Sequence, residues 1–272
     1  MHIVVDQNVL RKPALAGYLE SSVRNRCVLI DTAFLEMTQS KEWQSTLRAS
    51  LSQLVPYPER VVAAYSVSQG LARELRTLQS VAGHMLWREA TASVREVLTW
   101  LQTGKRNATI CRMIENPSDI DAKLKNDYFD HSQNKQSIES IVELVRAQLP
   151  REFQRALRKP VTSDEDRLEA VHQLATSVAY GVLAERGVAR NRARSFLRRR
   201  PLFYRLLILK AWNSIDWLHA GGLEGLKPKD ATNELLDQHY ALTATFFDGV
   251  LSEDAKVNRA YTALQALVPR EV

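Results

Sequence analysis

The sequence predicts an α/β fold whose mainly parallel central sheet is interrupted by a large helical insertion. Two short apolar runs, residues 3–6 and 27–30, flank a segment of helical length, and this order builds a parallel pair of strands. Strand signals become rare after residue 80 and return after residue 225. We therefore expect a core split into residues 1–80 and 225–272, with the insertion at 81–224 between them.

The N-terminal half alternates strands with helices. Apolar residues at a spacing of four indicate a helix over residues 13–26, between the first two strands. Thr32 is the expected N-cap of a helix that carries Glu36. Residues 60–65 form the expected third strand, and residues 67–80 the helix after it. Each of the first two strands is closed by an aspartate, at the edge of the sheet where open α/β folds place their functional crevice.

The insertion and the C-terminal half have their own signals. Ser163 and Asp166, three residues apart, resemble a capping box and predict the start of a long helix in the insertion. In the C-terminal half, residues 231–244 and 255–267 are expected to form helices on either side of a strand at 245–251. The β/α character of the core therefore resumes after the insertion.

The composition excludes several classes of protein. With 45% hydrophobic and 25% charged residues, the 272-residue chain is long enough to bury a large core, which argues against disorder and fibrous structure. Only two cysteines, Cys27 and Cys111, are present, so a disulfide framework and a cysteine-based zinc cluster are excluded. The N-terminus does not resemble a signal peptide, and no segment reaches 18 uncharged apolar residues. We expect a cytoplasmic protein that does not contact a membrane.

Charge is distributed unevenly along the chain, although the formal net charge is only +6. Residues 186–210 contain nine Lys or Arg and no Asp or Glu, whereas residues 230–254 contain six Asp or Glu and no Lys or Arg. A basic surface binds a polyanion, while clustered carboxylates repel phosphate unless divalent cations lie between them. This combination favours a metal-dependent nuclease, and a solvated helix face with ordinary surface acids is the alternative.

Four short segments resemble PIN-domain nucleases. They are residues 4–10 (VVDQNVL) with Asp6, residues 34–37 (FLEM) with Glu36, residues 235–241 (LLDQHYA) with Asp237, and residues 250–254 (VLSED) with Ser252 and Asp254. The resemblance covers about residues 1–80 and 225–267 and leaves the central portion outside it. It implies a three-layer α/β/α fold and an acidic pocket that binds Mg²⁺ or Mn²⁺ and cleaves phosphodiester bonds, most often in RNA.

Under this hypothesis, four carboxylates hold one or two divalent ions, directly or through water: Asp6, Glu36, Asp237 and Asp254. Oxygen ligands of this kind select hard cations. Asn8 is expected to orient Asp6 by a hydrogen bond, and the hydroxyl of Ser252 to orient a carboxylate, a water or a phosphate oxygen. These six residues are the expected catalytic group.

Each acidic residue also has a structural interpretation, which the sequence leaves open. Asp6 is able to accept backbone N–H groups of the following loop, and Asp254 is a suitable N-cap for the helix at 255–267. Glu36 and Asp237 lie on expected helices, where exposed acids are common. Asp248 either faces the pocket or points outward from its strand.

The basic segment supplies the expected nucleic-acid contacts. Six arginines fall within eleven residues: Arg190, Arg192, Arg194, Arg198, Arg199 and Arg200. The planar guanidinium group suits phosphate, so the segment indicates binding to the nucleic-acid backbone. It carries no pattern for reading bases, so no sequence preference is inferred.

The sequence therefore favours a metal-dependent endonuclease acting on RNA, in a toxin, defence or RNA-processing role. A DNA nuclease is the alternative enzyme, because the metal chemistry does not require a 2′-hydroxyl. A non-catalytic PIN-like adaptor that binds a protein through the helical insertion is the alternative class. A protein regulator or antitoxin and a homo-oligomeric state are both compatible with these interpretations.

Overall fold

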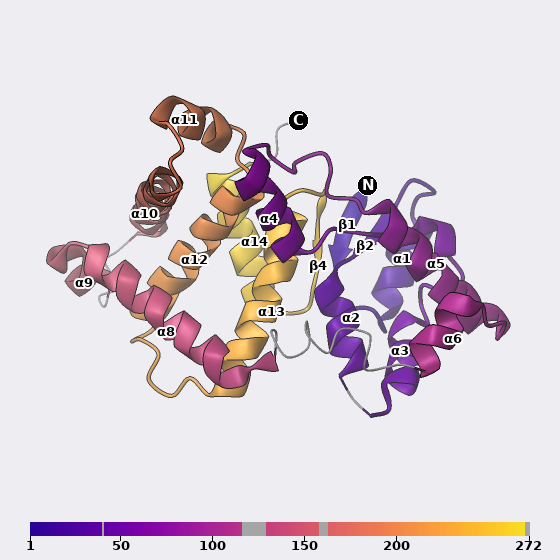
Figure 1. The fold of residues 1–272 in the computed structure, drawn as a ribbon. Helices are drawn as coiled ribbons and strands as arrows, with labels where there is room; N and C mark the ends of the chain where they lie inside the picture. The colour runs from indigo at the N-terminus through magenta and orange to yellow at the C-terminus, as the bar shows by residue number, and fades with distance from the viewer. Residues whose placement is uncertain (40, 116–128, 158–162, 270–272) are drawn as a thin grey trace. The chain divides into compact units, whose positions relative to one another are not determined.

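The computed structural model describes residues 1–39, 41–115, 129–157 and 163–269. Contacts within the chain define two compact units, whose elements are labelled in Figure 1. The first unit comprises Met1–Val67, Gly83–Phe129 and His239–Asn258, and the second comprises Ser68–Ala82, Asp130–Gln238 and Arg259–Val272.

The first unit is built on a four-stranded parallel sheet. Its strands are β1 (His2–Val5), β2 (Arg26–Leu29), β3 (Val61–Ala63) and β4 (Gly249–Leu251), in the order β3-β2-β1-β4. The register pairs Val4 of β1 with Val28 on one side and with Val250 on the other. The first and last strands of the chain are therefore neighbours, and the expected parallel α/β core is confirmed.

The first unit also contains several helices (Figure 1). They are α1 (Pro13–Glu20), α2 (Asp31–Thr38), α3 (Trp43–Leu51), α5 (Arg88–Thr103) and α6 (Ala108–Glu115), with a 3₁₀ turn at Pro58–Arg60. The strands are apolar because they are buried, and Val4, Val5, Val28 and Leu29 have no exposed surface. The helix α5 packs on β3, so residues that the sequence assigned to the insertion cluster with the sheet.

The second unit is helical. It contains α8 (His131–Gln148), α9 (Arg151–Leu157), α10 (Asp164–Glu185), α11 (Arg190–Arg198) and α12 (Leu202–His219), most of α4 (Val67–Thr77), and parts of α13 (Pro228–Ala244) and α14 (Ala255–Leu267). The helix α12 is its core and packs against α8, α9 and α10. Ser163 and Asp166 form the expected capping box at the start of α10.

A buried carboxylate joins two helices of the second unit. Glu74 of α4 has no exposed surface and accepts backbone N–H groups from Val81 (2.8 Å), Leu202 (2.9 Å) and Phe203 (2.8 Å). The last two are orphan donors in the first turn of α12, where a negative charge is favourable. No local pattern in the sequence predicts this contact.

Three local expectations were wrong. The first helix ends at Glu20, not at residue 26. The helix after β2 begins at Asp31, so Thr32 lies inside it and is not its N-cap. The last strand is Gly249–Leu251 only, because the backbone N–H groups of Thr245 and Phe246 bond to carbonyls three residues earlier and form turns. None of the described helices is long and apolar enough to cross a lipid bilayer.

Candidate functional site

Asp6 and Ser252 meet at the carboxyl edge of the sheet. Asp6 follows β1 and Ser252 follows β4, and parallel neighbours end at the same edge. The backbone N–H of Asp6 donates to the carbonyl of Leu251 at 3.0 Å, which extends the strand pairing to this point. The side chain of Asp6 is buried, with 4% of its surface exposed. Residues about 250 positions apart therefore form one site.

Hydrogen bonds fix the carboxylate of Asp6. The hydroxyl of Ser252 donates to its Oδ2 at 2.5 Å, and the backbone N–H of Asn8 donates to its Oδ1 at 3.4 Å. The same hydroxyl oxygen accepts the N–H of Asp254 at 3.0 Å. Ser252 therefore orients both Asp6 and the start of the loop that carries Asp254.

The side chain of Asn8 has a different role from the expected one. Its amide oxygen accepts the backbone N–H of Glu253 at 3.3 Å, and only its backbone contacts Asp6. Lys12 also forms an ion pair with Glu253 (3.2 Å), but both of these side chains are about half exposed and the pair contributes little. Asn8 therefore joins the loops after β1 and β4.

Glu36 lies on α2 beside the same site. The hydroxyl of Tyr240, on α13, donates to Oε2 of Glu36 at 2.6 Å. Burial raises the pKa of Glu36 to about 7, the hydrogen bond from Tyr240 acts to lower it, and the charge of Asp6 raises it. Tyr240 is fully buried and was not singled out in the sequence, although it falls within the segment 235–241 that carries the resemblance.

Asp254 performs the capping role that the sequence left open. It precedes α14, and its Oδ1 accepts the backbone N–H of Lys256 at 2.6 Å. Its Oδ2 receives no hydrogen bond from the residues that the structure describes, so the cap leaves one oxygen of the carboxylate for another ligand. The N-cap and a metal-binding role are therefore compatible.

Electrostatic coupling connects these carboxylates. Burial raises the pKa of Asp6, the hydrogen bonds from Ser252 and Asn8 oppose this, and the charge of Asp254 raises the pKa further. Asp6 is thus the central carboxylate, coupled to Asp254 on one side and to Glu36 on the other. A cation at this position would replace repulsion between carboxylates with attraction.

The fourth predicted acid, Asp237, lies on α13, three residues before Tyr240. Helical spacing puts Asp237 and Tyr240 on neighbouring positions of the same side of this helix. The contacts of Asp237 assign it to the second unit, whereas those of His239 and Tyr240 assign them to the first.

The described acidic residues supply only part of the donor set of a hard divalent ion. Among the described residues, no group of three or more His, Cys, Asp or Glu side chains is arranged to hold a metal ion. Mg²⁺, however, is commonly bound by one or two carboxylates, with waters and substrate phosphates completing its shell. Asp6 with one partner carboxylate matches that donor set, so the chemistry of the described side chains fits Mg²⁺ or Mn²⁺ bound in this way.

His239, which the sequence did not single out, lies at the carboxyl edge of the sheet. Nδ1 of His239 is 3.2 Å from the hydroxyl of Thr32, which follows β2 in the first turn of α2. Because His239 directly precedes Tyr240, one turn of α13 contacts α2 at both Thr32 and Glu36. A single histidine has no local signature in the sequence, so His239 could be identified only from the folded chain.

Asp248 and Cys27 lie outside the acidic site. Asp248 precedes β4 and accepts the backbone N–H of His2 at 2.5 Å, so it lies at the amino edge of the sheet, opposite Asp6. Cys27 is buried in β2, where burial raises the pKa of its thiol, and it is not a nucleophile. Asp248 therefore caps the sheet and does not face the acidic site.

The basic segment forms α11. Five of its arginines are exposed: Arg190, Arg192, Arg194, Arg198 and Arg199. Arg200 differs, since it is partly buried, has a positive φ of 45° and donates to the carbonyl of Pro269 at 2.8 Å. The apolar side of α11, with Phe196 and Leu197, is buried. The exposed arginines are available to a polyanion, whereas Arg200 has a structural role.

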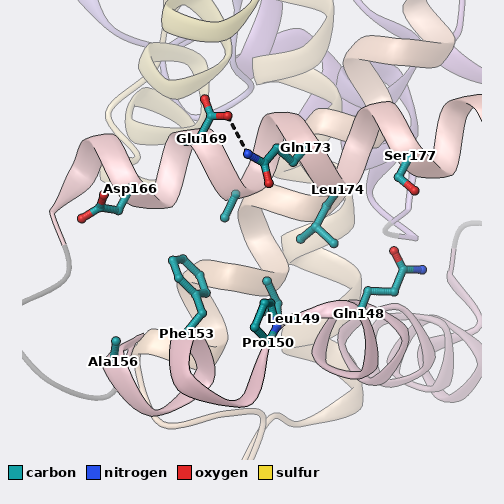
Figure 2. A pocket seen from close by; sticks show the side chains of 11 residues that line it. Gln148, Leu149, Pro150, Phe153, Ala156, Asp166, Glu169, Gln173, Leu174 and Ser177 are labelled. Carbon is teal, nitrogen blue, oxygen red and sulfur yellow. Dashed lines mark hydrogen bonds between the residues drawn. The ribbon is translucent and has the colours of Figure 1, made fainter.

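A cavity of about 610 Å³ in the second unit is lined by residues of α8, α9 and α10 and of the loop between α8 and α9 (Figure 2). Figure 2 shows Phe153 of α9 pointing toward α10, where Glu169 and Gln173 are hydrogen-bonded to each other at 2.7 Å. None of the catalytic, metal-binding or nucleic-acid-binding residues predicted from the sequence lines this cavity. Comparison of the chain with protein-family models, with curated proteins and with solved structures finds no match.

Proposed function

We propose that the protein is a metal-dependent endonuclease that hydrolyses phosphodiester bonds, with RNA as its preferred substrate. The observation that carries the proposal is that Ser252 is hydrogen-bonded to both Asp6 and Asp254 at the carboxyl edge of a parallel sheet. Burial and the charge of Asp254 raise the pKa of Asp6, and a carboxylate perturbed in this way is typical of functional sites. The resemblance of this edge to PIN-domain nucleases supplies the reaction and the preference for RNA.

The residues of the chain have separate roles in this proposal. Asp6 and one neighbouring carboxylate would hold Mg²⁺ or Mn²⁺, while Ser252 keeps Asp6 in one orientation. Tyr240 keeps Glu36 in position through its 2.6 Å hydrogen bond. The bound ion would supply Lewis-acid chemistry, in which it activates a water and neutralises charge on the scissile phosphate.

The exposed arginines of α11 would contact the nucleic-acid backbone. Four exposed guanidinium groups on α11, and that of Arg199 directly after it, provide phosphate contacts without base recognition. Replacement of Arg192 and Arg194 by glutamate should weaken binding and reduce its salt dependence. An unchanged salt slope would favour a protein partner for α11 instead.

The test is a cleavage assay with labelled single-stranded RNA and DNA, in Mg²⁺ or Mn²⁺ and in EDTA. Asp6→Asn keeps the shape of the side chain and should reduce cleavage at least about a hundredfold, as expected when a group that stabilises charge is removed. Asp230→Asn is the matched control, because Asp230 is exposed at the start of α13 and should leave the rate unchanged.

Two outcomes would reject parts of this proposal. Cleavage by the Asp6→Asn protein at the normal rate would assign the activity to another site or to a contaminant. Absence of both cleavage and calorimetric Mg²⁺ binding in the unmodified protein would favour a non-catalytic adaptor. Preferential cleavage of DNA would retain the site and change the substrate.

A further inference from the structure

Three arginines line a pocket in the second unit, and this pocket includes no residue of the acidic site or of α11. The pocket has a volume of about 290 Å³ and is lined by Arg146 of α8, by Arg151, Gln154, Arg155 and Leu157 of α9, and by Leu218 of α12. None of the described residues that line it is acidic. Its volume is at the lower limit for small-molecule sites, which suits a single compact group.

We infer that this pocket binds a phosphomonoester group. Three guanidinium groups carry a charge of +3, and Glu143 pairs with Arg146 at 2.6 Å and offsets one of these charges. The remaining charge of about +2 matches a phosphomonoester, which carries about −1.5 to −2 at neutral pH. A phosphodiester carries only one negative charge and has fewer terminal oxygens, so it matches the pocket less well.

The hydrogen-bonding state of the arginines supports this inference. Within the described part of the chain, the side chains of Arg151 and Arg155 make no ion pair. Both side chains are exposed, so their guanidinium groups are available to the oxygens of a phosphate group.

The frame of the pocket is held in place by side-chain hydrogen bonds. The amide of Gln154 donates to the carbonyls of Arg146 and Leu149, both at 2.8 Å, and fixes the corner between α8 and α9. At the other end of α9, Nδ1 of His219 is 2.5 Å from the carbonyl of Leu157, which ties this end to α12. A fixed frame reduces the entropy lost on binding.

The test is isothermal titration of the full chain with inorganic phosphate and methyl phosphate, at constant ionic strength. Both should bind, and dimethyl phosphate, a diester, should bind at least about tenfold more weakly, since one hydrogen bond to a charged group accounts for that factor. The variant Arg151→Ala/Arg155→Ala should lose at least about tenfold in affinity for methyl phosphate. Both replaced residues are exposed, so the fold should be retained, as checked by circular dichroism.

The matched control is Arg73→Ala/Arg76→Ala, which removes the same charge from exposed positions of α4 and should bind methyl phosphate normally. Arg146→Gln provides a second variant, which keeps most of the stem of this side chain. Equal loss in the pocket and control variants, equal binding of methyl and dimethyl phosphate, or no saturable binding would overturn the inference. Failure of the Asp6→Asn test would leave it unaffected, because the two sites share no residue.

Two further ligands distinguish the sources of the group. Tighter binding of a nucleoside 5′-monophosphate than of methyl phosphate, lost in the pocket variant, would support a free nucleotide. A preference for 5′-phosphorylated over 5′-hydroxyl RNA that the pocket variant loses would support recognition of a nucleic-acid end. Either result supports a phosphomonoester pocket.

Discussion

At the scale of single residues, the bond between Tyr240 and Glu36 controls the charge of the candidate site. The hydroxyl of Tyr240 donates to a carboxylate whose pKa is already raised to about 7 by burial and by Asp6. Near neutral pH, Glu36 is therefore divided between its two protonation states, and small changes in its surroundings alter the fraction able to bind a cation.

Replacement of Tyr240 by phenylalanine should raise the pKa of Glu36 further, because the lost hydrogen bond favours the ionised form. If the proposed activity needs ionised Glu36, the acidic limb of the pH–rate profile should move to higher pH, with cleavage at pH 7 about three- to tenfold slower. Tyr180→Phe, on α10 of the other unit, serves as control. An unshifted profile would show that Glu36 is not required in its ionised form.

Glu36 also makes the free energy of unfolding depend on pH. The pKa of Glu36 is raised from 4.5 to about 7 in the folded state, so the folded protein holds this proton more tightly than the unfolded chain. Its contribution, at most about 3 kcal/mol, is fully present below pH 4.5 and is lost as the pH rises toward 7. Urea denaturation from pH 4.5 to 8 should show this decrease, and Glu36→Gln should flatten it.

Added Mg²⁺ should oppose this decrease in the stability of the folded protein as the pH rises. A cation that binds the ionised carboxylates stabilises the folded state by mass action, and this effect grows with pH. The midpoint of urea denaturation at pH 8 should therefore rise with Mg²⁺ in the unmodified protein and not in Asp6→Asn. An equal rise in both proteins would place the Mg²⁺ site elsewhere.

At the scale of elements, close packing between α4 and α12 depends on a glycine. A Cβ atom built on Gly70 would lie 2.5 Å from Cδ2 of Leu202, which is fully buried. Next to this contact, Glu74 caps the start of α12. The two helices are thus joined by one polar and one steric contact.

Gly70→Ala should destabilise the protein by about 1–3 kcal/mol, because overpacking outweighs the higher helix propensity of alanine. Gly181→Ala in α10 is the matched control, since nothing lies within 4 Å of its Cβ position and it should stabilise by about 0.5–1 kcal/mol. Thermal unfolding of the two variants measures this. A stabilised Gly70→Ala protein would contradict the close approach of α4 and α12.

The sequence predicted those elements whose signals are local. The apolar runs at β1, β2 and β3 and the Ser163 capping box are confirmed, because a buried strand or a helix start depends on a few adjacent residues. The meeting of Asp6 with Ser252 was also predicted, since parallel strands end together. The bond from Tyr240 to Glu36 and the three bonds to Glu74 were not, because they join side chains and backbone groups that only the folded chain brings together.

At the scale of the whole molecule, the two units share continuous helices. The boundary between them falls inside α4, α13 and α14, so neither unit is a contiguous segment of the chain. The sequence suggested a core with an insertion between residues 81 and 224. Tertiary packing, such as that of α5 on β3, groups the residues differently, and such packing has no signature in a local pattern.

A chain that ends at residue 244 should fail to fold as a compact protein. It lacks β4, so β1 becomes an exposed edge strand of apolar residues, which promotes aggregation. Size-exclusion chromatography and limited proteolysis measure this, with a chain that ends at residue 269 for comparison. Protease resistance equal to that of the longer chain would show that β4 is dispensable.

The pairing of β1 with β4 also orders events during biosynthesis. A ribosome adds Asp6 and Glu36 more than two hundred residues before Ser252, whose hydroxyl holds Asp6. A nascent polypeptide that has not reached residue 249 therefore has the first carboxylates without the strand that assembles them. Translation itself withholds a finished acidic centre until the segment through Ser252 has been made.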